Sequence, residues 1–435
     1  MSPAAPVRAR VRMYRVGFGD ATLLTLEYPK PDADGRTERH LLFDCGTTRP
    51  SAFQKDGLVG VAELIRQHTG GQLDVLVISH RHRDHLSGFG DKKSSPILAS
   101  LKPKLVLRPW TEDPSLTDAA LAVAADEPQR AFAAGLRDAQ QMVEVLAGIA
   151  TGRSAAMREL AAAAQEQLPN RAAVEALDAL AAEGRGRYLR AGSRLALASV
   201  VPGLRVTVLG PPTLQQAPGV SKQASRDPEY WMFCLRQAML ALPAAPLAPG
   251  GAQLGPDVAS EVPPGPARWL IERLRSHRTQ SMLRLIRALD DALNNTSLIL
   301  LLEVGNLRLL FPGDAQIENW RYTLGRLAAN RSLRDKLTRV DLYKVGHHGS
   351  RNATPISLHG LWTTRPAGSP PLVSVMSTLP GVHGSTVATA VPRQTLVDAL
   401  QGAGTLYRTD HLPEERPYLE LVSDTASGPF VSVGG

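Results

Sequence analysis

The chain has 435 residues, enough for two or three average domains or for one large α/β domain that carries insertions. Its 49 lysines and arginines exceed its 41 aspartates and glutamates, and the formal charge of +8 favours anionic partners such as nucleic acid. Two cysteines, Cys45 and Cys234, are too few for a disulfide framework, and we see no signal peptide or membrane-spanning run, so we expect a soluble cytoplasmic protein without membrane contact.

The first 110 residues follow an order typical of α/β proteins. Strand and helix patterns predict strands at 11–17, 21–28 and 40–46, a helix at 57–68, and buried strands at 73–79 and 103–110. A helix between strands of this kind indicates layers of helix and sheet, so residues 1–110 are interpreted as the first half of an α/β domain.

Two segments interrupt this pattern. Residues 111–186 are dominated by alanine, leucine, arginine and glutamate, which predicts a largely helical insertion. Strands return at 187–213. Residues 214–290 form a second insertion, rich in proline and glycine at first and then basic and helical.

Residues 291–435 are again rich in strands and are interpreted as the second half of the interrupted domain. Their apolar patterns predict strands at 296–305, 307–314, 340–346, 371–378 and 405–410, with helices at 316–334 and 392–404.

Candidate metal ligands follow the strand at 73–79, in the segment HRHRDH. His80 and His82 are two residues apart, so on an extended backbone their side chains leave on the same side and can reach one cation. Asp84 and His85 follow and can reach a neighbouring cation. Imidazole and carboxylate together suit Zn²⁺, and four such residues in this order favour a metal site over a basic loop whose histidines only form hydrogen bonds.

Other ligand types recur at predicted strand ends. Asp314 follows LRLLFPG, His347 and His348 follow VDLYKVG, and His383 lies beyond PLVSVM. Asp44 follows HLLF in the same way. Each residue alone suits a turn, a helix cap or a polar surface, but their recurrence indicates a site that distant segments close together.

These residues carry a resemblance to the metallo-β-lactamase fold superfamily, whose H-x-H-x-D-H signature matches residues 80–85. More narrowly, the chain resembles the soluble hydrolase domains of the ComEC family of competence DNA-uptake proteins, through VGFGDATLL, LLFDCG, NNTSLILLLEVGNLRLLFPGD, KVGHHGS and LYRTD. The resemblance implies a four-layer αβ/βα sandwich, here with a largely helical insertion. The membrane channel of the competence proteins is absent from this sequence, so a role in DNA import is not carried over.

The chain departs from the superfamily pattern in two places. Most members supply a third histidine to the first metal, and here LNNTSLI offers Asn294 and Asn295. The expected cofactors are two divalent ions, Zn²⁺ or Mn²⁺. Because this histidine is missing, the alternatives for the first ion are that it is weakly held, lost or chosen for oxygen ligands, and the alternative to two ions is a single tightly bound one. His383 is followed by glycine, where the related domains have proline.

The expected chemistry is hydrolysis of a phosphodiester by attack of a metal-bound hydroxide between two ions roughly 3.5–4 Å apart. Asp314 is the candidate bridge, and Asp84 and His347 are the candidate catalytic residues, His347 as the general acid. The predicted metal ligands are His80, His82, Asp84, His85, Asp314, His348 and His383.

Five further residues are predicted to assist. Asp44 is expected to orient a ligand imidazole, and Asp20 fits either a glycine-flanked turn or support of the ligands. Ser350, Lys344 and Asn295 are candidates for contact with the substrate.

The leading hypothesis is a DNA or RNA nuclease that acts on nucleic acid or a nucleotide. Hydrolysis of a lactone or thioester is the second, because a fold does not fix its substrate. The third is a partner-binding component of a multi-protein defence system, with a weakened active site and with the helical insertion as its docking surface.

Overall fold

A computed structural model describes residues 5–32, 34–53, 56–116, 129–130, 133–134, 171–217, 292–350, 354–382 and 390–433. The chain divides into two compact units. The first comprises Met1–Ala134, Pro169–Val220 and Leu293–Gly435 and holds both sheets, and the second comprises Gly135–Leu168 and Ser221–Ala292. The second unit lies almost wholly outside the described residues, so the predicted structure of the two insertions stays a prediction there.

The first sheet has eight strands in the order β14-β13-β1-β2-β3-β4-β5-β6. The strands from β14 to β3 pair antiparallel, and those from β3 to β6 pair parallel. Their bounds are β1 Arg8–Tyr14, β2 Thr22–Glu27, β3 Glu38–Phe43, β4 Val75–Val77, β5 Leu105–Pro109, β6 Gly186–Leu189, β13 Tyr418–Asp424 and β14 Val431–Ser432.

The second sheet has six strands in the order β12-β11-β10-β9-β8-β7. The strands from β12 to β9 are parallel, whereas β9, β8 and β7 form an antiparallel meander. Their bounds are β7 Leu204–Gly210, β8 Ile299–Val304, β9 Leu307–Phe311, β10 Leu342–Lys344, β11 Leu372–Met376 and β12 Gly404–Arg408.

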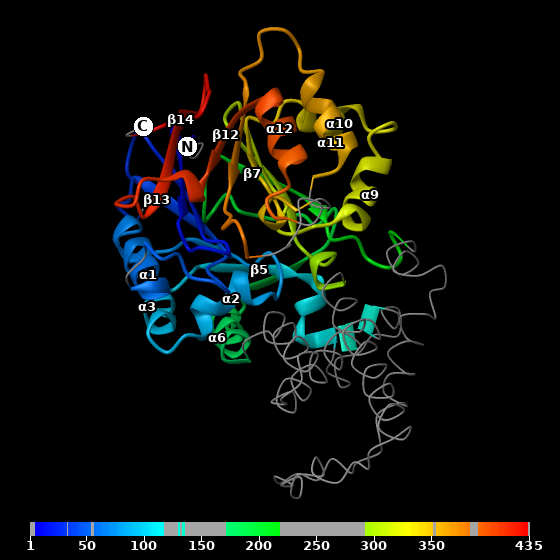
Figure 1. Cartoon of the computed structure of the whole chain (residues 1–435). Helices are drawn as coiled ribbons and strands as arrows, with labels where there is room; N and C mark the ends of the chain where they lie inside the picture. Colours follow the sequence, from blue (N-terminus) through cyan, green and yellow to red (C-terminus); the bar gives the residue numbers. More distant parts are fainter. Residues whose placement is uncertain are drawn as a thin grey trace, which may run out of the picture. The chain divides into compact units, whose positions relative to one another are not determined.

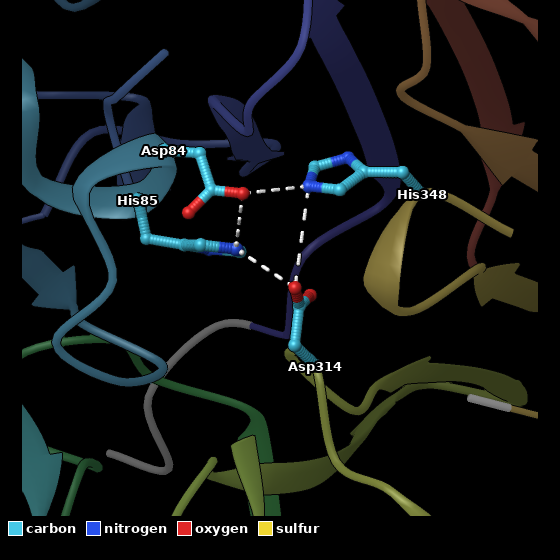
Figure 2. Close-up of side chains that lie close together, drawn as sticks. All are labelled: Asp84, His85, Asp314 and His348. Carbon is cyan, nitrogen blue, oxygen red and sulfur yellow. Dashed lines mark hydrogen bonds and ion pairs between the residues drawn. The ribbon is translucent and has the colours of Figure 1, made fainter. Parts of the chain in front are cut away.

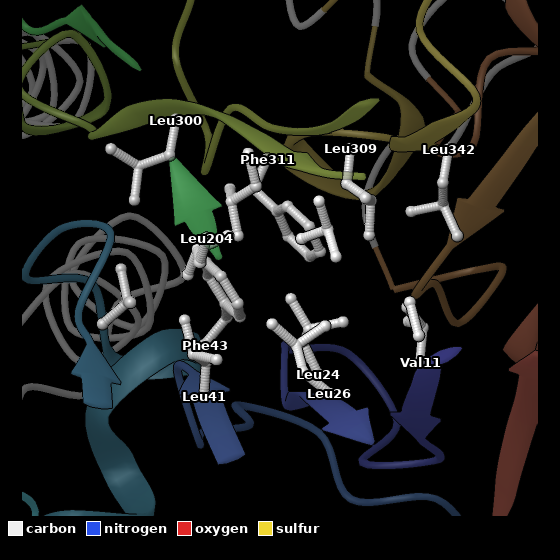
Figure 3. Close-up of a cluster of buried hydrophobic side chains, with 14 of the residues drawn as sticks. Val11, Leu24, Leu26, Leu41, Phe43, Leu204, Leu300, Leu309, Phe311 and Leu342 are labelled. Atoms are coloured by element: carbon white, nitrogen blue, oxygen red, sulfur yellow. The ribbon is translucent and has the colours of Figure 1, made fainter. Parts of the chain in front are cut away.

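One apolar core joins the two sheets. Successive residues of a strand point to opposite faces of its sheet, so every second residue can enter this core. In β4, Val75 and Val77 enter this shared core and Leu76 faces the other side. Figure 3 shows the shared core, in which the rings of Phe43 and Phe311 stack with their centroids 4.1 Å apart. Burial of such side chains contributes roughly 1.5–3 kcal/mol each.

Each sheet packs a set of helices against its other face. The first set is α1 Gly57–His68, α2 Arg83–Gly90, α3 Ser94–Ser100 and α6 Arg171–Ala181. The second set is α9 Ile317–Gly325, α10 Arg331–Thr338, α11 Ile356–Thr363 and α12 Gln394–Ala403, and Figure 1 shows these two sets apart from one another. The α/β class is confirmed, and α6, within the predicted helical insertion, belongs to the first unit.

The single helix predicted at 316–334 is wrong, because the structure forms α9 and α10 with a break between them. Asn330 caps α10 by accepting a hydrogen bond from the backbone N–H of Leu333, which starts a new helix where the pattern alone suggested continuation. In the described parts of the chain, no helix has both the length and the apolar character needed to cross a bilayer.

The parallel strands decide where a site can form. The carboxyl ends of β3, β4, β5 and β6 share one edge of the first sheet, and those of β9, β10, β11 and β12 share one edge of the second. Loops at such edges are where α/β proteins gather their polar side chains.

Candidate metal centre

Asp84 and His85 are presented by the first turn of α2, which begins three residues after His80. The helix start is held by the backbone, since the N–H of Asp20 donates to the carbonyl of Asp84 (3.0 Å) and that of Cys45 donates to His85 (2.9 Å). Asp84 and His85 follow β4, and the segments after β1 and β3 hold their carbonyls.

Asp314 follows β9 through a tight turn. Gly313 has φ +55°, and a Cβ there would lie 2.8 Å from the side chain of Ser79, so glycine is needed for both conformation and space. The Oδ1 of Asp314 accepts a hydrogen bond from the backbone N–H of His347 at 2.9 Å. Its Oδ2 is left to face the other ligand candidates.

His348 follows β10, in a short 3₁₀ turn with unusual backbone geometry. His347 and His348 have φ of +44° and +52°, values that a non-glycine residue adopts only when its surroundings hold it there. The Nδ1 of His348 lies 3.0 Å from the carbonyl of Ser377, and because a carbonyl can only accept, Nδ1 is the donor. The Nε2 atom is thereby directed into the site.

The four residues Asp84, His85, Asp314 and His348 form one buried cluster, shown in Figure 2. One potential ligand atom from each lies within 4.8 Å of the others. The Nε2 of His348 is 2.9 Å from Asp84 Oδ2 and 4.0 Å from Asp314 Oδ2, and the Nε2 of His85 is 3.2 Å from Asp314 Oδ2.

Asp44 and Ser79 set the orientation of His85. The Nδ1 of His85 lies 2.8 Å from Asp44 Oδ2, which also accepts a hydrogen bond from the hydroxyl of Ser79 at 2.7 Å. Asp44 Oδ1 accepts from the backbone N–H of Ser79. An imidazole that donates through Nδ1 to a carboxylate offers Nε2 as a ligand, which is the usual arrangement behind metal-binding histidines.

The charges in the cluster are strongly coupled. Burial alone lowers the pKa of His85, but Asp314, Asp84 and Asp44 outweigh it and raise that pKa well above its ordinary value. Burial alone raises the pKa of Asp84 and Asp314, but His85 and His348 outweigh it and lower both pKa values. The shifts favour charged carboxylates and charged imidazoles beside one another, so opposite charges are paired within the cluster.

The donor set suits a divalent metal ion. Two carboxylates and two imidazoles are the mixed oxygen and nitrogen ligands that Zn²⁺ and Mn²⁺ accept. The Nε2 of His85 is buried without a well-aligned hydrogen bond to any described residue, an arrangement that a ligand interaction would satisfy. This cluster can therefore hold a metal ion.

His80 and His82 lie beside the cluster but are not brought into it. Their rings hydrogen-bond to each other, with His80 Nε2 2.8 Å from His82 Nδ1, and the ring of His80 lies 4.3 Å from that of His85. Asn294 approaches His82, is fully buried, and has no well-formed hydrogen bond at either polar side-chain atom. Of the two asparagines in LNNTSLI, Asn294 faces this pair, whereas Asn295 donates to Glu318 (3.3 Å).

Lys344 forms a buried pair with Asp20. Its side chain is buried and its ammonium contacts Asp20, and its predicted contact with phosphate stays a prediction. Asp20 Oδ2 lies 3.9 Å from His85 Nε2, which places Asp20 next to the ligands. Burial raises the pKa of Asp20 and Lys344 opposes the increase.

The remaining predicted residues are spread around the cluster. His347 is half-buried, and its Nδ1 lies 2.8 Å from the hydroxyl of Ser350. The substrate contacts predicted for Ser350 and Asn295 stay predictions. His383 lies outside the described residues.

Two contributors were not predicted from the sequence. Ser79 binds Asp44 through both its backbone and its side chain, and its place between a buried strand and the histidines was a usable signal. Ser377 acts through its carbonyl, which any residue could supply, so no side-chain pattern could reveal it.

No protein-family model matches this sequence, and no curated protein matches it either.

Proposed function

We propose that this protein is a metal-dependent phosphodiesterase that cleaves DNA or RNA. The observation that carries the proposal is the buried Asp84–His85–Asp314–His348 cluster with the half-buried His347 at its side. A divalent ion held there would act as a Lewis acid on a phosphoryl oxygen and lower the pKa of a water molecule.

The chain's own residues supply positioning and proton transfer. Asp44 and the carbonyl of Ser377 hold the Nδ1 atoms of His85 and His348, so both Nε2 atoms stay directed at the cluster. His347 is the proposed general acid. Its backbone N–H donates to Asp314 and its Nδ1 lies 2.8 Å from the hydroxyl of Ser350, and these contacts hold the ring from which a leaving oxygen would be protonated.

The proposal includes the metallo-β-lactamase fold. Two sheets with a shared core, helices packed on the other face of each, and ligand candidates at strand carboxyl ends support a four-layer αβ/βα sandwich. The mutual hydrogen bond of His80 and His82, with Asn294 alongside, supports one tightly held ion in place of two.

The test measures metal content and hydrolysis together. Purified protein with Zn²⁺ or Mn²⁺ is expected to hydrolyse bis(p-nitrophenyl) phosphate and labelled DNA or RNA. Asp84→Ala should lose both metal and activity, whereas His347→Ala should keep the metal and lose about 10²–10⁴-fold in rate on substrates whose leaving group needs a proton. Asp398→Ala, on the exposed face of α12, is the matched control.

Unchanged activity in Asp84→Ala would contradict the proposal. Turnover of lactones or thioesters without phosphodiester cleavage would favour the acyl hydrolase. A protein that binds no divalent ion and hydrolyses none of these substrates would favour the partner-binding alternative.

A further inference from the structure

A basic hollow of about 590 Å³ lies away from the four-residue cluster. It is formed by the end of β6, the loop that follows, and α9, and no acidic residue is found among the described residues that line it. The charged and aromatic side chains of its wall are Arg187, Tyr188, Arg190, Arg194, Tyr322 and Arg326. Positive charge and tyrosine rings together distinguish it from a general solvated surface.

Among the described residues, no carboxylate pairs with the arginines of this hollow. Arg190 and Arg194 are exposed, and neither guanidinium has a carboxylate partner within the part of the chain that the structure describes. Arg187 donates to the carbonyls of Gly184 and Gly186, and Arg326 lies over the ring of Tyr322 at 5.3 Å. Arg171, an exposed arginine outside the hollow, by contrast pairs with Glu175 at 2.9 Å.

The loop that carries Arg190 and Arg194 is held in place by the second sheet. The backbone N–H groups of Ala191 and Gly192 donate to Pro211 (2.8 Å) and Val208 (2.9 Å), and the amide of Gln216 donates to the carbonyl of Ala191 (2.9 Å). A loop tied in this way presents its charges with less loss of conformational entropy when a ligand binds.

The hollow and the cluster share one edge of the first sheet. Because β4, β5 and β6 are parallel and in register, Arg190 follows β6 on the side where His80 follows β4. The ends of β4 and β6 lie two strand spacings apart, roughly 10 Å. The opposite wall of the hollow belongs to α9, which begins three residues after Asp314.

We infer that this basic hollow binds the sugar-phosphate backbone of a single-stranded nucleic acid whose scissile bond lies at the metal cluster; the inference rests on the proposed function. A guanidinium can bind phosphate oxygens through two parallel N–H donors. The half-buried rings of Tyr188 and Tyr322, each with an arginine (Arg108 or Arg326) near its ring, are the candidates for base stacking. Stacking of this kind needs unpaired bases, which a duplex does not expose. The single strand is therefore the expected substrate form.

The binding experiment removes cleavage from the measurement. Fluorescence anisotropy of labelled 20-nucleotide single strands, DNA and RNA, is followed in EDTA over a range of salt concentrations. Arg190→Ala/Arg194→Ala is expected to weaken binding at least tenfold and to reduce the slope of log K against log salt by about 1.4, since each phosphate contact to a single strand contributes about 0.7. Arg171→Ala on α6 is the matched control and should bind as the wild type does.

Hydrolysis of bis(p-nitrophenyl) phosphate by metal-loaded protein separates the two proposals, and the double variant should retain wild-type turnover of this small substrate. Equal strand binding by the double variant and the wild type overturns the inference and leaves the proposed function intact. Tighter binding of a duplex than of a single strand also overturns it. If strand binding depends on the two arginines but no substrate is hydrolysed, the binding site is supported and the proposed function is contradicted.

Discussion

Asn294 shows how one side chain can set the number of metal ions. It is buried beside His82 and makes no well-formed hydrogen bond, so the first half of the site lacks a third strong ligand. Asn294→His is expected to raise the content of bound Zn²⁺ from about one to about two ions per chain, because imidazole is a far better zinc ligand than an amide. The measurement is elemental analysis after dialysis.

The neighbouring residue provides the control. Asn295→His, which replaces a side chain that contacts Glu318, should leave the metal content at one ion. Two ions in the wild-type protein, or no gain in Asn294→His, would show that Asn294 does not limit binding.

The Lys344–Asp20 pair is a second feature at the scale of single residues. It joins β10 of the second sheet to the turn between β1 and β2, and both side chains are buried. Lys344→Met should lower the free energy of unfolding by about 3–5 kcal/mol, because it leaves the Asp20 carboxylate buried without its cation. Urea titration measures the change.

The double variant tests the cause. Asp20→Asn/Lys344→Met removes both charges and should recover most of the lost stability, giving a coupling free energy of at least about 2 kcal/mol in the mutant cycle. If the double variant loses as much stability as the two single variants together, the pair is not energetically linked.

At the scale of elements, the start of α2 depends on close backbone packing. A Cβ on Gly46 would lie 2.6 Å from the carbonyl carbon of His85 and 2.7 Å from that of Asp84. Gly46→Ala must therefore push α2 away, and we expect a cost of about 1–3 kcal/mol together with at least tenfold weaker metal binding. Isothermal titration with Zn²⁺ measures the affinity.

Gly360→Ala is the matched control. Gly360 lies inside α11, and a Cβ added there would meet no described atom within 4 Å, so alanine should be neutral or slightly stabilising. Wild-type zinc affinity in Gly46→Ala would show that the approach of the two backbones is not needed for the site.

The elements that carry the ligands could be predicted from the sequence, because histidine and aspartate residues follow segments with the apolar pattern of a strand. Asp84 and His85 after β4 and Asp314 after β9 were found in this way, and the structure places them together. Of the pair His347 and His348, the sequence analysis named His348 as the metal ligand, and the structure places His348 in the cluster. The orientation of its side chain depends on the φ values of the turn and on the carbonyl of Ser377, just after β11, both of which arise only in the folded chain.

Other contacts likewise arise only in the folded chain. Lys344 lies in a predicted strand and close to a glycine. Neither feature indicated that its side chain would be buried against Asp20, 324 residues away in sequence. His80 and His82 suited a shared cation by spacing, and the structure places His80 Nε2 2.8 Å from His82 Nδ1, so their shared cation stays a prediction. The contact of Lys344 joins distant segments, so local spacing could not reveal it.

At the scale of the whole first unit, the candidate metal centre depends on both sheets. Asp84 and His85 follow a strand of the eight-stranded sheet, whereas Asp314 and His348 follow strands of the six-stranded sheet. The shared apolar core holds the two edges together, with Leu24, Leu26 and Leu41 opposite Leu300 and Leu309 in Figure 3. A bound ion would therefore link the stability of one sheet to that of the other.

This linkage gives the last prediction. Zn²⁺ at about 100 times its Kd should raise the free energy of unfolding by about 2.7 kcal/mol, and urea unfolding followed by tryptophan fluorescence measures it. Asp84→Asn and His348→Ala should each abolish the whole increment, although the two residues belong to different sheets. Leu26→Ala, in the shared core, should lower stability by about 2–5 kcal/mol with and without metal and keep the increment. An increment that survives in either ligand variant would mean that one sheet alone holds the ion.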